Sequence, residues 1–240
     1  ADICRRLDGI PLAIELAAAR VSALPVEKIA ARLSDRFRLL TGGDQTALPR
    51  QQTLRALIDW SHDLLTDPER VLLRRLAVFA GGWTLEAAEG VCAGGGIDEA
   101  EVLDLLTHLV DKSLVAMDAD GSRYRLLETV REYALARLYE SGEGMEARTR
   151  HLEHYVAFGE KAKHAFYGPA QADMLARLDL ERENILAAHV WAAHEPPGGE
   201  LGLRLAYSVG PYWYARGQPD LGRRLNEEAL AAVDEAIRLR

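Results

Sequence analysis

One interruption in an otherwise helical pattern constrains the fold of this chain most. Two short runs, residues 114–118 and 122–126, flank the dipeptide Asp120-Gly121. The change of period at these runs favours strands, and Asp-Gly is the dipeptide expected in a tight hairpin turn. The sequence therefore predicts a two-stranded hairpin inside a chain whose remaining periodicity is helical.

Capped helices precede this hairpin, and one helix follows it. Thr66-Asp67-Pro68-Glu69 reads as a capping box with Pro in the first turn, and Asp98 with Glu101 forms a second box. The predicted helices cover about residues 53–65, 67–81, 84–92, 98–112 and 128–139. Helices that lead into a hairpin follow the order of a winged helix. We predict this domain for residues 48–142.

A sharp bend lies near the start of the chain. Gly9 tolerates the left-handed backbone that follows a helix end, and Pro11 suits the first turn of the next helix. Ile10 and Leu12 flank the proline ring, so the corner could form a wall against a flat ligand. We assign the bend to a small helical unit, residues 1–47.

Beyond the predicted winged helix, the pattern is wholly helical. The predicted helices cover residues 151–163, 170–194, 201–216 and 221–240, with breaks rich in Gly and Pro. Paired helices joined by short turns favour a tetratricopeptide-like superhelix over residues 143–240. Such repeats build concave surfaces suited to protein or peptide ligands. The predicted fold class is mainly α, with one small β-hairpin.

Charge argues against direct DNA binding. The chain has a formal net charge of −8, whereas nucleic-acid and anionic-membrane binders need positive surface. The helix before the hairpin has only Lys112 against five acidic residues: Asp98, Glu99, Glu101, Asp104 and Asp111. The hairpin adds Arg123 and Arg125, too few to reverse that balance. We expect DNA binding by this module to be unfavourable, and keep a winged-helix DNA binder as an alternative.

Other residue patterns give no catalytic or metal site. Cys4 and Cys92 lack metal-ligand spacing and are expected to be reduced thiols. The pair His151-x-x-His154 is expected on a solvated helix face, since a metal needs more ligands than two. No nucleophile elbow or metalloprotease helix occurs, and no apolar run is long enough to span a membrane. The sequence therefore predicts a non-enzymatic, cytoplasmic fragment of a longer protein.

An aromatic cluster lies in residues 143–240, which we call the helical region. It consists of Tyr207, Tyr212, Trp213 and Tyr214, close to Gly210-Pro211. Helix-to-helix core is the first interpretation, and a groove that binds a partner is the alternative. A helical-repeat scaffold that binds proteins without any nucleotide therefore stays open as a function.

Two segments resemble parts of NB-ARC-type signalling ATPases, the STAND class, which includes bacterial regulators of the LuxR and SARP/AfsR kinds. Residues 7–18, LDGIPLAIELAA, resemble the GxPL segment of this class, and residues 124–134, YRLLETVREYA, resemble its Met-His-Asp segment. The resemblance implies the regulatory part of an ADP/ATP-controlled switch, which closes over nucleotide held by an upstream P-loop domain and oligomerises when open. The implied wall against the nucleotide comprises Gly9, Ile10, Pro11 and Leu12.

The chain departs from this class at the Met-His-Asp segment. Leu127 stands where the resemblance implies the histidine that reaches the β-phosphate of ADP. Leucine cannot donate a hydrogen bond to phosphate. Either Arg125 or Arg131 replaces that donor, or protein contacts alone hold the closed state, which is the interpretation we favour.

Overall fold

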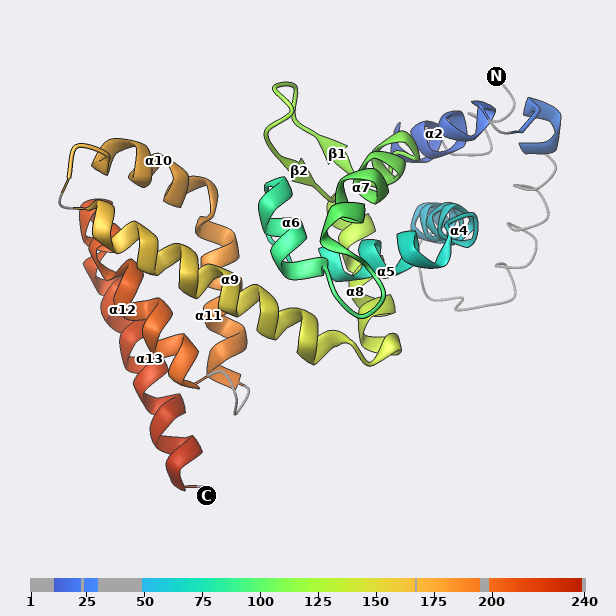
Figure 1. Ribbon diagram of the computed structural model, residues 1–240. Coiled ribbons are helices and arrows are strands. Elements are labelled where there is room, and N and C mark those ends of the chain that lie inside the picture. The colour runs from blue at the N-terminus through green and yellow to red at the C-terminus, as the bar shows by residue number, and fades with distance from the viewer. Residues whose placement is uncertain (1–10, 23, 30–48, 167, 195–198, 239–240) are drawn as a thin grey trace.

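The computed structural model describes residues 11–22, 24–29, 49–166, 168–194 and 199–238 (Figure 1). Within these ranges helices dominate and the strands form one antiparallel hairpin, so the predicted fold class is confirmed. The first described elements are α2 (Pro11–Ala18) and η1 (Ala19–Ser22), and α2 packs against α4 (Pro49–Asp63).

The winged-helix domain follows α4. Its elements are α5 (Asp67–Leu76), α6 (Leu85–Cys92), η2 (Glu99–Glu101), α7 (Val102–Asp111), β1 (Ala116–Met117), β2 (Tyr124–Arg125) and α8 (Glu128–Ser141). Trp83 pairs with the hairpin as a third, one-residue strand, through two 2.8 Å backbone hydrogen bonds with Tyr124. Gly82 has φ +100°, and a Cβ there would lie 2.8 Å from the carbonyl oxygen of Tyr124. Only glycine fits this close approach.

Both predicted capping boxes are confirmed. The backbone N–H of Thr66 donates to Glu69 Oε2 at 2.8 Å, and that of Asp98 donates to Glu101 Oε2 at 3.0 Å. These bonds satisfy N–H groups that a helix start otherwise leaves without partners. Local sequence thus fixes where α5 and the η2–α7 segment begin.

Two local predictions were wrong. The helix expected to reach about residue 81 ends at Leu76, because the next three N–H groups bond three residues back in a tighter turn. The hairpin turn spans residues 118–121, closed by the N–H of Gly121 donating to Asp118 O at 2.9 Å. Asp120-Gly121 therefore ends a four-residue turn, with Gly121 at φ +73°, and does not form a two-residue turn. The register pairs Ala116 with Arg125 and Met117 with Tyr124.

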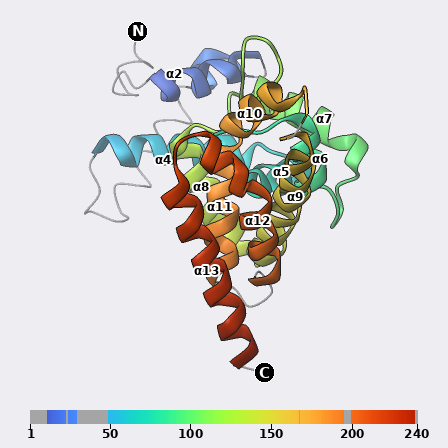
Figure 2. The same cartoon turned by 90° about the vertical axis from the view of Figure 1, so that its left-hand side faces the viewer.

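The helical region contains five described helices. They are α9 (Gly144–Ala165), α10 (Gln171–Leu180), α11 (Arg182–His194), α12 (Gly199–Ala215) and α13 (Pro219–Arg238). Helices α11, α12 and α13 pack side by side, and α9 packs against α11 and α12 (Figure 2). The single helix predicted over residues 170–194 is two helices that break at Glu181, and α9 begins seven residues before its predicted start at residue 151.

Helix α9 joins the two parts of the molecule. It leaves the winged-helix domain after α8, crosses α6 and continues along α11 and α12 (Figure 1). One apolar core is continuous from α2 to α13, and its largest fully buried side chains are Trp83, Trp213, Tyr155, Tyr212 and Phe79. The predicted division of the chain at residues 47 and 142 stays a prediction. No helix in the described ranges is long and apolar enough to cross a membrane.

Candidate functional site

The outer face of α7 is acidic. In a winged helix, this helix holds the position from which base edges are read. Its exposed side chains, with those of η2, include Glu99, Glu101, Asp104 and Asp111. The neighbouring cation, Lys112, pairs with the buried carboxylate of Glu69 in the core of the domain. The described part of this face therefore presents carboxylates where DNA binding needs positive charge.

The wing is the hairpin formed by β1 and β2, and each of its two arginines forms an ion pair. Arg125 pairs with Asp118 across the hairpin, at 3.1 Å between Nη1 and Oδ1. Arg123 reaches out of the winged-helix domain and pairs with Glu181, at the break between α10 and α11. Its side chain is only 11% exposed. The wing is thus turned toward the helical region.

Glu181 is the centre of a buried polar network. The hydroxyl of Tyr155 donates to its Oε2 at 2.6 Å, and the side-chain amide of Asn184 donates to the same oxygen at 2.8 Å. Burial and this carboxylate raise the pKa of Tyr155 well above its ordinary value, so its proton stays in place. We call these three residues and Arg123 the Glu181 centre.

Asn184 extends this centre into the winged-helix backbone. Its amide also donates to Gly82 O at 2.7 Å, and its Oδ1 accepts from the N–H of Ala80 at 2.6 Å. Asn184 is fully buried. One side chain of α11 thereby satisfies a donor and an acceptor in the segment between α5 and α6, which ties the two parts together with defined geometry.

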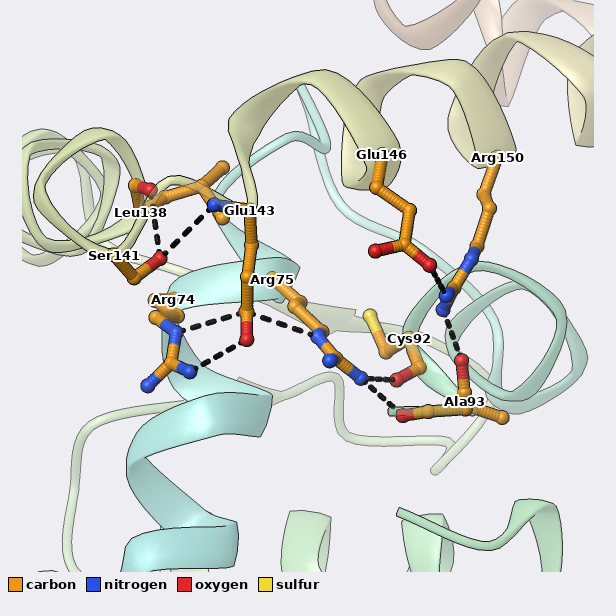
Figure 3. Close-up of polar contacts among 10 residues, drawn as sticks. Arg74, Arg75, Cys92, Ala93, Leu138, Ser141, Glu143, Glu146 and Arg150 are labelled. Atoms are coloured by element: carbon orange, nitrogen blue, oxygen red, sulfur yellow. Dashed lines mark hydrogen bonds and ion pairs between the residues drawn. The ribbon is translucent and has the colours of Figure 1, made fainter. Parts of the chain in front are cut away.

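A second polar contact lies at the start of α9 (Figure 3). Glu143 accepts two bonds from Arg74, at 2.8 and 2.9 Å, and one from Arg75 at 3.3 Å. Arg75 also donates to the carbonyls of Cys92 and Gly94, at 2.8 and 2.6 Å. The bonds from Arg74, with those from Arg75, lower the pKa of Glu143. We call Glu143 and its two arginines the Glu143 centre; Figure 3 also shows Arg150 of α9 donating to the Ala93 carbonyl.

Aromatic side chains of the winged-helix domain and of α9 pack against one another beside the Glu181 centre. Phe79 stacks on Trp83 with ring centroids 5.3 Å apart, and His151 lies 5.2 Å from Phe79 and 4.8 Å from Tyr155. Burial lowers the pKa of His151 to about 3, so it is neutral at pH 7. The expectation of a solvated histidine pair was wrong, because α9 presents this face to the winged-helix core: His151 is buried and His154 is half-buried.

A cleft opens beside the Glu181 centre. Its volume is about 500 Å³, and its walls come from the start of α6, the wing, α9 and α10. Arg123 and Glu181 close its inner end, while Lys161 and Arg177 lie along its rim. No cluster of three or more metal-ligating side chains occurs in the part of the chain that the structure describes.

The nucleotide-site residues implied by resemblance are only partly described. Gly9 and Ile10 lie outside the described residues. Pro11 is the exposed first residue of α2, and Leu12 follows it in that helix. Leu127 is the N-cap of α8, with a 37% exposed side chain. Arg125 is on the wing and forms an ion pair with Asp118. These positions as a nucleotide site stay a prediction.

The aromatic cluster divides between core and surface. Tyr212 and Trp213 are buried where α12 packs on its neighbours, whereas Tyr207 and Tyr214 are 63% and 78% exposed. Cys92 is a buried free thiol, and burial raises its pKa to about 12. Cys4 lies outside the described residues.

Sequence reasoning missed the Glu181 centre. The signal it could have used is Asn184, since asparagine is unfavourable inside a helix unless its amide has a partner. The charged run Glu181-Arg182-Glu183 contains no Gly or Pro, so it gave no sign of a helix break.

The comparisons with known proteins agree with this domain structure. A family model described as a winged helix-turn-helix domain matches residues 65–139. Residues 65–139 form a winged helix-turn-helix domain. The match covers α5 to α8 and the wing, so the Glu181 centre joins this domain, through Arg123, to the helical region outside it.

Similar proteins occur in mycobacteria. The chain is 51% identical over 220 residues to proteins of Mycobacterium tuberculosis and Mycobacterium bovis that bear the name "Putative HTH-type transcriptional regulator". The match covers 90% of this chain and 24% of the relative, so the chain spans about a quarter of that protein's length. It is 50% identical over 156 residues to an "Uncharacterized protein" of Mycobacterium tuberculosis, covering 64% of this chain and 40% of that protein. No solved structure matches the chain.

Proposed function

We propose that this chain is a regulatory segment of a transcriptional regulator, in which the winged helix-turn-helix domain is docked on the helical region through its wing. The observation that carries the proposal is the position of Arg123. This wing residue, which in a DNA-binding winged helix would be available to phosphates, is instead held by a carboxylate of the helical region. The name of the mycobacterial relatives, HTH-type transcriptional regulator, supports a role in transcription.

Docking through the wing would let the winged helix-turn-helix domain respond to changes in the helical region. A change in the helical region that moves Glu181 would release the wing and loosen the segment that Asn184 holds. The helical region would then sense a protein or peptide, for which the exposed Tyr207 and Tyr214 of α12 offer surface. Signal and response would be linked through the Glu181 centre.

Hydrogen–deuterium exchange tests the docking. Replacing Arg123 by Gln should speed exchange in residues 80–87 and 178–187, because the wing then loses its partner. The matched control is Arg125→Gln, a wing arginine whose partner lies within the hairpin. Equal exchange in the two variants would contradict the proposal.

DNA binding by the same domain is the second candidate function. The match to the winged helix-turn-helix model favours it, and the acidic face of α7 opposes it. We expect no salt-sensitive binding of mixed duplex DNA at micromolar concentrations in 50–200 mM salt. Fluorescence anisotropy measures this directly, and an affinity that falls steeply with salt would favour the second candidate.

We further propose that the full-length protein is controlled by ADP and ATP, on the basis of the resemblance to STAND proteins. Full-length protein, with an upstream P-loop domain, would bind ADP or ATP, and Pro11 would lie against the nucleotide. Arg125 and Arg131 are both ion-paired, to Asp118 and Glu128, which supports a closed state held by protein contacts instead of a phosphate donor. ADP should co-purify with the full-length protein and be lost in Pro11→Ala, but be retained in the exposed control Pro169→Ala.

A gain-of-function variant tests where the Met-His-Asp segment lies. Leu127→His would restore a donor for the β-phosphate of ADP. A hydrogen bond to a charged group contributes roughly 1.5–3 kcal/mol, so ADP release should slow about ten- to a hundredfold. An unchanged release rate would contradict the placement of this segment at Leu127.

A further inference from the structure

The cleft beside the Glu181 centre has the dimensions of a ligand site. Its volume of about 500 Å³ lies within the usual range for pockets that hold small organic molecules, roughly 300–1,000 Å³. The winged helix-turn-helix domain contributes one side, and helices α9 and α10 contribute the other. Any molecule bound there would touch both parts of the chain.

One wall of the cleft is aromatic. Phe158 of α9 is partly buried and lies beside Tyr155, with ring centroids 6.2 Å apart. The guanidinium of Arg177 lies 5.7 Å from the centroid of the Phe158 ring. Small side chains, Ala87 and Ala157, complete this part of the lining and leave room for a flat group.

The charges at the cleft leave cations in excess. Arg123 and Glu181 neutralise each other at the inner end. The carboxylate of Glu86 accepts from its own backbone N–H and from Thr84, which lowers its pKa. Lys161 makes no hydrogen bond or ion pair with any described residue, and Arg177 has only the Phe158 ring and the field of Glu86. Two cations therefore face one engaged carboxylate.

We propose that this cleft binds a small anionic molecule that carries a planar ring. A carboxylate or phosphate group would be held by Lys161 and Arg177, and the ring would lie against Phe158. Because the wall on the opposite side belongs to α6 and the wing, the bound molecule stabilises the docked arrangement. The site does not depend on whether the winged helix-turn-helix domain contacts DNA or the full-length protein binds nucleotide.

Titration calorimetry with simple probes tests the proposal. Benzoate carries a carboxylate on a phenyl ring, and phenyl phosphate carries a phosphate on the same ring. Benzyl alcohol lacks the charge, and inorganic phosphate lacks the ring. We expect saturable binding of at least one of the two ring anions to the 240-residue chain. Its affinity should exceed that of benzyl alcohol and of inorganic phosphate about fivefold or more. The better of the two ring anions identifies the anionic group.

Three methionine variants locate the bound anion. Lys161→Met and Arg177→Met should each weaken binding about five- to thirtyfold, because each removes one charge-assisted contact. Lys163→Met is the matched control: this lysine is on α9 too, but it lies over the Tyr207 ring, outside the cleft. All three side chains are at least partly exposed, so the variants should fold, which circular dichroism checks.

Three results would overturn the proposal. One is that neither ring anion binds saturably, and another is that benzyl alcohol or inorganic phosphate binds as tightly as the ring anions. The third is that Lys163→Met weakens binding as much as Lys161→Met and Arg177→Met. A rise in melting temperature with the bound probe, absent in Lys161→Met, would support the docked arrangement as the bound state. The docking itself is tested separately, by exchange in Arg123→Gln without any ligand.

Discussion

The Glu181 and Glu143 centres join the same two parts of the molecule in different ways. Each has a carboxylate at its middle and at least one arginine from the winged helix-turn-helix domain. The side chain of Glu181 is 9% exposed and has one arginine and two neutral donors, whereas that of Glu143 is 25% exposed and has two arginines. Burial makes the first centre intolerant of change, because any group left without its partner stays out of water.

The comparison also suggests different roles. The Glu143 centre lies where α8 passes into α9, and α8 packs on α5, so Arg74 and Arg75 lie close to Glu143 whenever the winged helix-turn-helix domain is folded. The Glu181 centre instead joins the wing to the break between α10 and α11, which lies outside that domain. Separation of the two parts would therefore open the Glu181 centre first and leave the Glu143 centre as the hinge.

Loss of Glu181 should give the largest effect. Glu181→Leu leaves Arg123 as a buried charge without its partner and removes the acceptor of Tyr155 and Asn184. We expect a loss of about 3–5 kcal/mol in the free energy of unfolding, measured by urea denaturation. The control Glu183→Leu, whose side chain is 59% exposed, should cost less than about 1 kcal/mol. Similar losses in Glu181→Leu and Glu183→Leu would show that the buried network around Glu181 adds nothing to stability.

The next largest effect should come from Asn184. Asn184→Leu leaves the partly buried N–H of Ala80 and the buried carbonyl of Gly82 without partners, at a cost of about 2–3 kcal/mol. Asn226→Leu is the control, because its amide bonds only to a carbonyl of its own helix. Urea denaturation measures both. A loss no larger in Asn184→Leu than in the control would show that the bridge adds nothing to stability.

Acid acts on the aromatic packing around His151. The pKa of His151 is lowered to about 3 by burial, from an ordinary value of 6.5. As pH falls below 6.5, the unfolded chain binds a proton that the folded chain excludes, so stability falls. Between pH 6.5 and 5 the loss from this residue should be about 1.5 kcal/mol.

His151→Phe tests this assignment. The ring would still pack between Phe79 and Tyr155, and the buried Nε2 that has no partner would be gone. Urea denaturation at pH 5 and 6.5 should show a smaller acid-induced loss in the variant, by about 1.5 kcal/mol. The same acid sensitivity in both proteins would place the titrating group elsewhere.

The smallest effect should come from Glu143. Glu143→Gln keeps an acceptor for the arginines and removes the charge, and the site is partly exposed. We expect a loss of about 1 kcal/mol at pH 7. Because its folded pKa is lowered by the two arginines, this contribution disappears as pH falls below the ordinary value of 4.5. Urea denaturation at pH 7 and at pH 3.5 measures both. A loss as large as that of Glu181→Leu would overturn the comparison.

The sequence by itself determined the order of the helices and strands, but not the break between α10 and α11. Capping boxes and helical periodicity act within a few residues of one another, so Thr66 with Glu69 and Asp98 with Glu101 could be recognised directly. The winged-helix order and the acidic character of α7 follow from the same local information. The GxPL and Met-His-Asp interpretations come from resemblance, and they stay predictions.

Only the tertiary structure decided which faces meet. The break at Glu181, the burial of His151, and the division of Tyr212 from Tyr214 depend on residues that lie tens of positions away in the chain. Periodicity shows that a helix has an apolar face, but it does not show what covers that face or which polar side chains are carried in with it. The docking of the wing on the helical region, and the cleft beside it, are therefore properties of the folded chain alone.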